Sequence, residues 1–187
     1  MHPVIEAAGR RAELPPWAQL TAERRAHVER VADLLSEWAD TLGLPEEERI
    51  RWLAAGRLHD ALKDAPIAEM REFVGEGAWP DALLHAPAAA GRLARDGVDD
   101  EPLLLAIAYH SVGHPAFGDL GEHLYLADYL EPGRPDGAER DELQRAMPGE
   151  RGRVLPQVIR RRLERELEAG HPILPAALGF WNRVVET

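Results

Sequence analysis

Apolar residues recur at three- and four-residue spacing through most of this chain, and this periodicity constrains the fold more than any other feature. It is clearest over residues 21–42, 46–62 and 155–167. Such spacing gathers the apolar side chains on one face of an α-helix, whereas a half-buried strand would alternate apolar and polar residues. No alternating run of β-branched residues occurs. The sequence therefore predicts an all-α fold, built as a single helical bundle with a C-terminal helical extension.

Residues that begin or end helices divide the chain further. Thr21 is placed to cap the first long helix, which Gly43 ends, and Pro45 begins a second helix that carries His59 and Asp60 in its last turns. Further helices are expected over residues 81–95, 101–111, 120–130 and 155–170. We expect three parts: an N-terminal segment (1–20), a core (21–135) and C-terminal helices packed on that core (136–187).

Charge and cysteine content exclude several classes of function. The chain has 187 residues, no cysteine and a formal net charge of −11. Without cysteine there are no disulfides or thiolate metal sites, so any metal is bound by nitrogen and oxygen. The negative charge disfavours nucleic acid and anionic membranes as partners. No secretory leader or membrane-spanning run is visible, which predicts a cytoplasmic protein. The oligomeric state stays open, a homodimer included.

Histidines inside apolar helical patterns are the first indication of chemistry. A single buried histidine is more often a hydrogen-bonded core residue than a ligand. Here several such histidines fall near the ends of different expected helices, as do two aspartates. A bundle that turns these ends toward one cavity supplies six ligands: His27, His59, Asp60, His85, His110 and Asp128. His123 is a weaker candidate, and we assign His2, His123 and His171 to the surface or to packing.

The adjacent pair His59 and Asp60 favours a site for two metals. Neighbouring helical residues point about 100° apart, so the imidazole can bind one metal while the carboxylate bridges to a second. Neutral imidazole and carboxylate suit iron, manganese, cobalt, nickel and zinc alike.

These residues resemble those of a known family, the HD-domain phosphohydrolases. The motifs are "RAH" at 25–27, "HDALK" at 59–63, "HAPAAAG" at 85–91, "AIAYHSVG" at 106–113, "YLADYLEPGR" at 125–134 and "GHPILPAALGFWN" at 170–182. Together they are similar to the YqeK-type branch, the symmetrical diadenosine tetraphosphate hydrolases. The resemblance assigns the phosphohydrolase core to residues 21–135.

The resemblance implies a mechanism and a ligand set. A hydroxide held between two metals, iron in this family, would attack the substrate and release two ADP. The implied ligands are His27, His59, Asp60 and Asp128 at one metal, and Asp60, His85 and His110 at the other. Asp60 would thus be central to catalysis.

Other residues are candidates for contacts with the substrate. Lys63 is the only lysine beside 21 arginines, and it lies close enough to Asp60 in the sequence to reach the nucleophile or a phosphate oxygen. Arg134 is suited to bidentate binding of phosphate, and Glu131 to orienting that arginine or a metal ligand. Ser111 and His114 are further candidates. Arg160, Arg161 and Arg162 are accompanied by Glu164, Glu166 and Glu168 on the same stretch and are expected on a solvated face.

Two alternatives remain at this point. One is an HD-type phosphohydrolase that acts on another nucleotide, either a mononucleotide or a cyclic nucleotide. The other is a non-catalytic signalling module on the same scaffold, although such modules usually lose ligands and this chain retains six.

Overall fold

The fold is all-α, as the periodicity predicts. The computed structural model describes residues 1–75, 79–133 and 137–186, and these contain helices and turns but no strand. The helices are α1 (Pro3–Arg11), α2 (Ala22–Thr41), α3 (Glu46–Leu58), α4 (Ile67–Val74), the 3-10 turn η1 (Asp81–Leu83), α5 (His85–Arg95), α6 (Glu101–Tyr109), α7 (Asp119–Leu130), α8 (Gly137–Ala146), α9 (Arg151–Glu168) and α10 (Pro175–Val185). Among these described residues, no helix combines the length and apolar character needed to cross a membrane.

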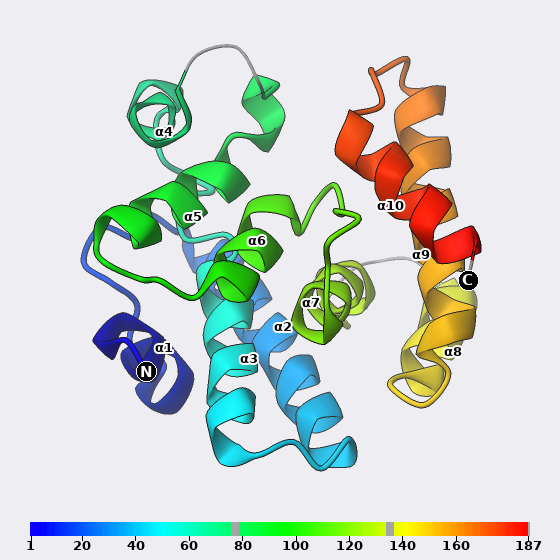
Figure 1. Cartoon of the computed structure of the whole chain (residues 1–187), viewed down its shortest axis with the longest axis horizontal. Coiled ribbons are helices and arrows are strands. Elements are labelled where there is room, and N and C mark those ends of the chain that lie inside the picture. Colours follow the sequence, from blue (N-terminus) through cyan, green and yellow to red (C-terminus); the bar gives the residue numbers. More distant parts are fainter. Residues whose placement is uncertain (76–78, 134–136, 187) are drawn as a thin grey trace.

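Helix α7 lies at the centre of the molecule. It packs against α2, α3 and α6 on one side and against α8 and α9 on the other. Figure 1 shows α8, α9 and α10 together on the side of α7 away from α1. The C-terminal helices thus cover a face of the core that α7 would otherwise expose.

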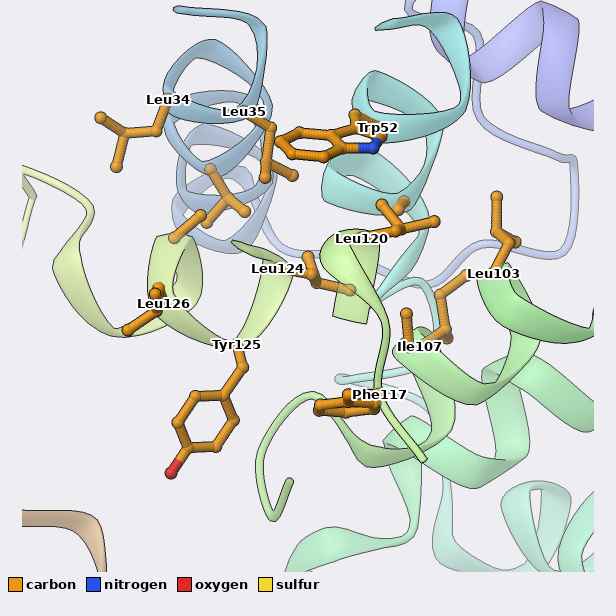
Figure 2. Close-up of a cluster of buried hydrophobic side chains, with 14 of the residues drawn as sticks. Leu34, Leu35, Trp52, Leu103, Ile107, Phe117, Leu120, Leu124, Tyr125 and Leu126 are labelled. Carbon is orange, nitrogen blue, oxygen red and sulfur yellow. The ribbon is translucent and has the colours of Figure 1, made fainter. Parts of the chain in front are cut away.

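The core joins the helices that later carry the candidate site. Figure 2 shows Leu35 of α2 and Trp52 of α3 on the same side of the cluster, with Leu120 and Leu124 of α7 beside them. All four side chains are at most 6% exposed. Because each is fully or nearly fully buried, each contributes on the order of 2 kcal/mol of hydrophobic stabilisation. This packing holds the helices that carry the histidines in register with one another.

The predicted helix starts are confirmed at Thr21 and Pro45. The Thr21 hydroxyl accepts a hydrogen bond from the amide of Arg24 at 3.2 Å, and α3 begins directly after Pro45. The predicted end of α3 is wrong by a few residues, because the helix stops at Leu58 and His59 is its C-cap. Beyond Leu58, backbone amides donate hydrogen bonds to the carbonyl oxygen only three residues earlier, and this tightens the chain. One of these bonds runs from Lys63 N to Asp60 O at 2.8 Å. Asp60 and Lys63 therefore lie in turns beyond the helix rather than on its face.

A close approach between α2 and α3 depends on Gly56. A Cβ atom at this position would lie 2.8 Å from Ala32 Cα and 3.0 Å from Ala32 N. Both are backbone atoms, so one helix would have to move. His27 is on α2 and His59 follows α3, so this spacing also sets the distance between two candidate ligands.

We predict that Gly56→Ala lowers the free energy of unfolding by about 1–3 kcal/mol, because the added methyl group overpacks the contact between the helices. The matched control is Gly152→Ala in α9, where a Cβ atom meets nothing within 4 Å. That change should be neutral or stabilising by up to about 1 kcal/mol, because alanine is the better helix former. Urea unfolding measures both values. Equal effects of the two substitutions would contradict the role of Gly56.

Candidate metal centre

The structure brings all six predicted ligands together in the interior. They come from the inner ends or edges of five different helices and the turn after α3. Each side chain is buried, with the residue no more than 6% exposed: His27, His59, Asp60, His85, His110 and Asp128. Buried histidines and carboxylates in such numbers are costly unless they are paired or bind a metal.

Asp60 divides the cluster into two halves. Its Oδ2 lies 3.8 Å from His27 Nε2 and 3.7 Å from His59 Nε2. Its Oδ1 lies 3.2 Å from His85 Nε2 and 3.4 Å from His110 Nε2. In each half, one atom from each of the three residues lies within 4.8 Å of the others, a spacing that suits a shared ion. One carboxylate thus faces two separate pairs of imidazoles.

Asp128 joins the first half only. Its Oδ1 lies 3.2 Å from His27 Nε2 and 3.9 Å from His59 Nε2. The first half therefore offers two nitrogens and two carboxylates, whereas the second offers two nitrogens and the shared Asp60. This difference gives the two sides unequal charge.

Three histidine rings are oriented by hydrogen bonds at the ring nitrogen that faces away from the cluster, and for two of them the partner is a backbone carbonyl oxygen. His59 Nδ1 lies 2.7 Å from Gly56 O, and His110 Nδ1 lies 2.9 Å from Ile107 O. A carbonyl oxygen only accepts, so Nδ1 carries the proton and Nε2 presents its lone pair to the cluster. Both rings use the same device, a carbonyl three residues earlier at a helix C-terminus. The bond that closes the helix end also aims the ligand.

His27 is oriented by Glu131, as the sequence suggested for a residue supporting a ligand. His27 Nδ1 lies 3.2 Å from Glu131 Oε1, and Glu131 also accepts a hydrogen bond from Arg30 Nε at 2.5 Å. Burial opposes ionisation of Glu131, but hydrogen bonds from His27, Arg30 and the amide of Gly133 lower its pKa to about 2. Glu131 is therefore a fixed anion behind His27.

Burial controls the protonation of the inner histidines. It lowers the pKa of His59 to about 3 and also lowers the pKa of His85, so both are neutral near pH 7 with a lone pair available. Burial also acts to lower the pKa of His27, but the adjacent carboxylates of Asp128 and Glu131 outweigh it and raise the pKa to about 8. A cation binding at His27 would therefore displace a proton.

The donor set fits a divalent metal. Within the described part of the chain, three inward-facing atoms are buried and make no hydrogen bond: His27 Nε2, His59 Nε2 and Asp60 Oδ1. Imidazole nitrogen and carboxylate oxygen are ligands for iron, manganese, cobalt, nickel and zinc. A metal bound between these atoms would offset the cost of burying them.

The predicted substrate-binding residues have different surroundings. Lys63 Nζ lies 3.2 Å from His85 Nε2, at the edge of the cluster. Ser111 Oγ lies 2.9 Å from His110 Nε2. His114 instead packs on Tyr109, with ring centroids 4.5 Å apart, and its Nδ1 accepts from the amide of Ala116. Arg134 lies outside the described residues.

Arg162 differs from its predicted place on a solvated face, because it is buried and only 8% exposed. It donates to Asp128 Oδ2 at 2.9 Å and to the carbonyl oxygens of Ser111 and Tyr125 at 3.0 and 3.1 Å. Its guanidinium also lies 4.4 Å from the ring centroid of Tyr125. By holding Asp128 Oδ2, Arg162 leaves Oδ1 turned toward the histidines.

The sequence contained a signal for this burial. The apolar stripe of α9 runs through Leu155, Val158, Ile159 and Leu163, and position 162 completes its three- and four-residue spacing. An arginine on an apolar stripe indicates that its side chain is buried and paired with a partner. This signal is lost when the three consecutive arginines are interpreted as one exposed charged run.

Comparisons with known proteins agree with this geometry. The HD domain family model matches residues 24–133. A crystal structure from Clostridium acetobutylicum, described as a predicted HD superfamily hydrolase involved in NAD metabolism, superposes with a TM-score of 0.75. It is 27% identical, over 89% of this chain and 91% of that one.

Curated relatives share a more specific name. The symmetrical bis(5'-nucleosyl)-tetraphosphatase of Bacillus subtilis (strain 168) is 30% identical over 175 residues, which is 89% of this chain and 92% of the relative. The protein of the same name from Halalkalibacterium halodurans is 29% identical over 175 residues, 89% of this chain and 91% of the relative.

The shared position of Asp60 predicts unequal effects of two substitutions on metal content. Asp60→Ala should lose both metals because both halves lose a ligand, whereas His110→Ala should deplete mainly one. The control is His171→Ala, because the side chain of His171 is 63% exposed. Elemental analysis of anaerobically purified protein gives the metal content per chain. Equal content in Asp60→Ala and His110→Ala would contradict a shared carboxylate.

Arg162→Met should weaken metal binding at the half that contains Asp128, by about tenfold or more, because it leaves a buried carboxylate without its partner. The control is Arg160→Met on the same helix, where the side chain is 58% exposed and pairs with Glu164. Titration with a graded chelator measures the affinity of each half, and Arg162→Lys serves if the methionine variant does not fold. Metal affinity unchanged in both Arg162 variants would rule out this role.

Proposed function

The chain belongs to the HD-domain family, and from that premise we propose that it hydrolyses dinucleoside tetraphosphates, above all diadenosine tetraphosphate, symmetrically into two nucleoside diphosphates. The observation that carries the proposal is the position of Asp60, whose two oxygens face separate pairs of histidines. A hydrolase with one metal needs only one half of this arrangement. A bridging carboxylate is the feature expected of a site with two metals.

In this proposal the six clustered side chains hold two divalent cations, with iron as the expected metal. The division is His27, His59, Asp60 and Asp128 for one, and Asp60, His85 and His110 for the other. Bound cations lower the pKa of water toward neutrality and offset the charge that develops on phosphoryl oxygens.

Two cationic side chains beside the cluster are placed to hold the polyphosphate. Lys63 Nζ lies 3.2 Å from His85 Nε2, and Arg24 Nη1 donates to Asp60 Oδ2 at 2.9 Å. Both line the cavity that opens onto Asp60. In a protein with a net charge of −11, Lys63 supplies local positive charge for a polyanion, and Arg24 would do so once a bound cation offsets the charge of Asp60. Lys63, with three rotatable donors, can shift from the imidazole to a phosphate oxygen.

A pair of cation sites suits the middle of a tetraphosphate. Such a substrate is symmetric about its central bridging oxygen, so the two inner phosphates present equal groups to the two halves of the cluster. Attack of water on one inner phosphorus forms a P–O bond and breaks the bond from that phosphorus to the central oxygen. The leaving group is one nucleoside diphosphate, and the phosphoryl group that receives the water oxygen becomes part of the second.

The test is product analysis of the metal-loaded protein with diadenosine tetraphosphate in ¹⁸O-labelled water. We expect ADP as the only nucleotide product, with one ¹⁸O atom in half of the ADP, because one of the two product molecules receives the water oxygen. Asp60→Ala should abolish the reaction. Formation of ATP and AMP in equal amounts would show asymmetric cleavage and reject the proposal.

A further inference from the structure

A cavity of about 260 Å³ opens beside the candidate metal centre, and the C-terminal helices form its far wall. Its inner end contains Asp60, His110 and Asp128. Its far wall comes from α9, α10 and the turn between them, and is lined by the aliphatic side chains Ile159, Leu163, Ile173, Leu174 and Ala177. One end of the cavity is therefore ionic, and the far wall combines aliphatic side chains with Arg165 and Glu166.

Aromatic rings from α7 add to the apolar part. Tyr125 and Tyr129 both line the cavity, and Arg162 lies against them, 4.4 and 5.3 Å from their ring centroids. Figure 2 shows the Tyr125 ring directed away from the side of the core that contains Trp52. Flat rings and aliphatic side chains beside charged groups such as Arg162 and Arg165 suit a ligand that has a flat ring with polar edges.

A second hollow next to the centre has a different character. Its volume is about 600 Å³, and it lies on the side of His27. Within the described residues its lining has no aliphatic or aromatic side chain apart from the imidazole of His27, and it is dominated by Arg24, Arg30, Arg140, Arg165, Glu23, Asp64 and Glu131. Arg24 and Arg165 line both spaces. The centre thus lies between a cavity that contains aliphatic and aromatic side chains and a hollow that is lined mainly by charged ones.

We propose that the cavity between α7, α9 and α10 is the subsite for one nucleoside of the substrate, and that the other nucleoside lies over the charged hollow without an equivalent pocket. The proposal rests on the proposed function, because it needs a substrate whose phosphates reach the metal centre. A polyphosphate at Asp60 leads directly into the cavity, and burial of the base against aliphatic and aromatic groups stabilises the complex. The volume is slightly below the range of about 300–1,000 Å³ for pockets that hold drug-sized ligands, so it suits one nucleoside.

The two halves of a symmetric substrate are therefore bound unequally. One nucleoside is recognised by Tyr125 and Tyr129 of α7 together with residues of α9 and α10, which follow the HD domain match that ends at residue 133. The other is held mainly through its phosphates. Specificity for the base should therefore reside at one end of the substrate.

The experiment narrows the cavity and compares two ligands that share the phosphates but differ in the nucleoside. Ile173→Trp places a large ring in the cavity from a partly exposed position in the turn. Ala177→Leu is the second variant, in case the first does not fold. Leu178→Trp is the matched control, because Leu178 is on the same helix as Ala177 but is 47% exposed. Calorimetric titration of metal-loaded protein with ADP and with inorganic pyrophosphate gives the affinities.

We expect ADP to bind at least about tenfold more weakly to the two cavity variants, while pyrophosphate stays within about twofold of the parent. The control variant, Leu178→Trp, should bind both ADP and pyrophosphate with affinities within about twofold of the parent. A loss of ADP affinity below about fivefold in both cavity variants, or an equal loss for pyrophosphate, overturns the subsite.

A substrate with one nucleoside tests the inequality of the two ends. Adenosine 5'-tetraphosphate should be hydrolysed to ADP and pyrophosphate with a kcat/KM within about tenfold of that for diadenosine tetraphosphate, since the second nucleoside contributes little. A larger loss shows that the second nucleoside has a site of its own and overturns the inequality. The binding titrations do not depend on turnover. A parent protein that binds ADP in the cavity but makes no ADP from the dinucleotide would reject the proposed function and leave the subsite standing.

Discussion

Asp60 is a carboxylate buried among four imidazoles, and the arrangement of the surrounding helices serves to hold it there. Burial opposes its ionisation, but His59, His110 and His85 around it keep its pKa well below the usual value. An ionised group in this position needs compensating charge on both of its oxygens. Arg24 donates to Oδ2, whereas Oδ1 lies between two histidines and makes no hydrogen bond within the described residues. Asp60 thus presents one anion to two groups of histidines that different helices supply.

Rigid positioning comes from the backbone at helix ends. His59 and His110 are both C-caps, and both rings donate to the carbonyl oxygen of the residue three positions earlier, in the last turn of the helix. Each of these hydrogen bonds selects the tautomer that directs Nε2 inward. Gly56 has a third role, because it supplies the carbonyl for His59 and permits the close approach of α2. A few backbone atoms thus affect both the stability of the fold and the orientation of the imidazole rings.

Much of this could be predicted from the sequence, and the remainder has a physical explanation. Helical periodicity identified the all-α class, and the six residues that meet in the interior were identified because their imidazoles and carboxylates follow a known motif. Their role as metal ligands stays a prediction. The division at residues 20 and 135 stays a prediction. The position of Asp60 beyond α3 was missed because the helix ends in backbone hydrogen bonds between residues three apart, and no glycine or proline in the sequence marks that end. Arg162 was missed because its partner, Asp128, is 34 residues away in the chain. A contact at that distance depends on tertiary packing, and local charge patterns contain little information about it.

The charges around the centre also bear on the order in which metal and substrate bind. Three arginines near the candidate ligands each pair with a carboxylate that offsets their charge: Arg24 with Asp60, Arg30 with Glu131 and Arg162 with Asp128. Such pairs present little net positive charge, and the protein as a whole carries −11. A polyphosphate approaching the protein alone would therefore gain little and would be repelled over most of the surface. Divalent cations add charge that these pairs do not cancel, so the site becomes attractive to a polyanion once it is loaded. This distribution of charge favours an order of binding in which the metal binds first and the polyphosphate second.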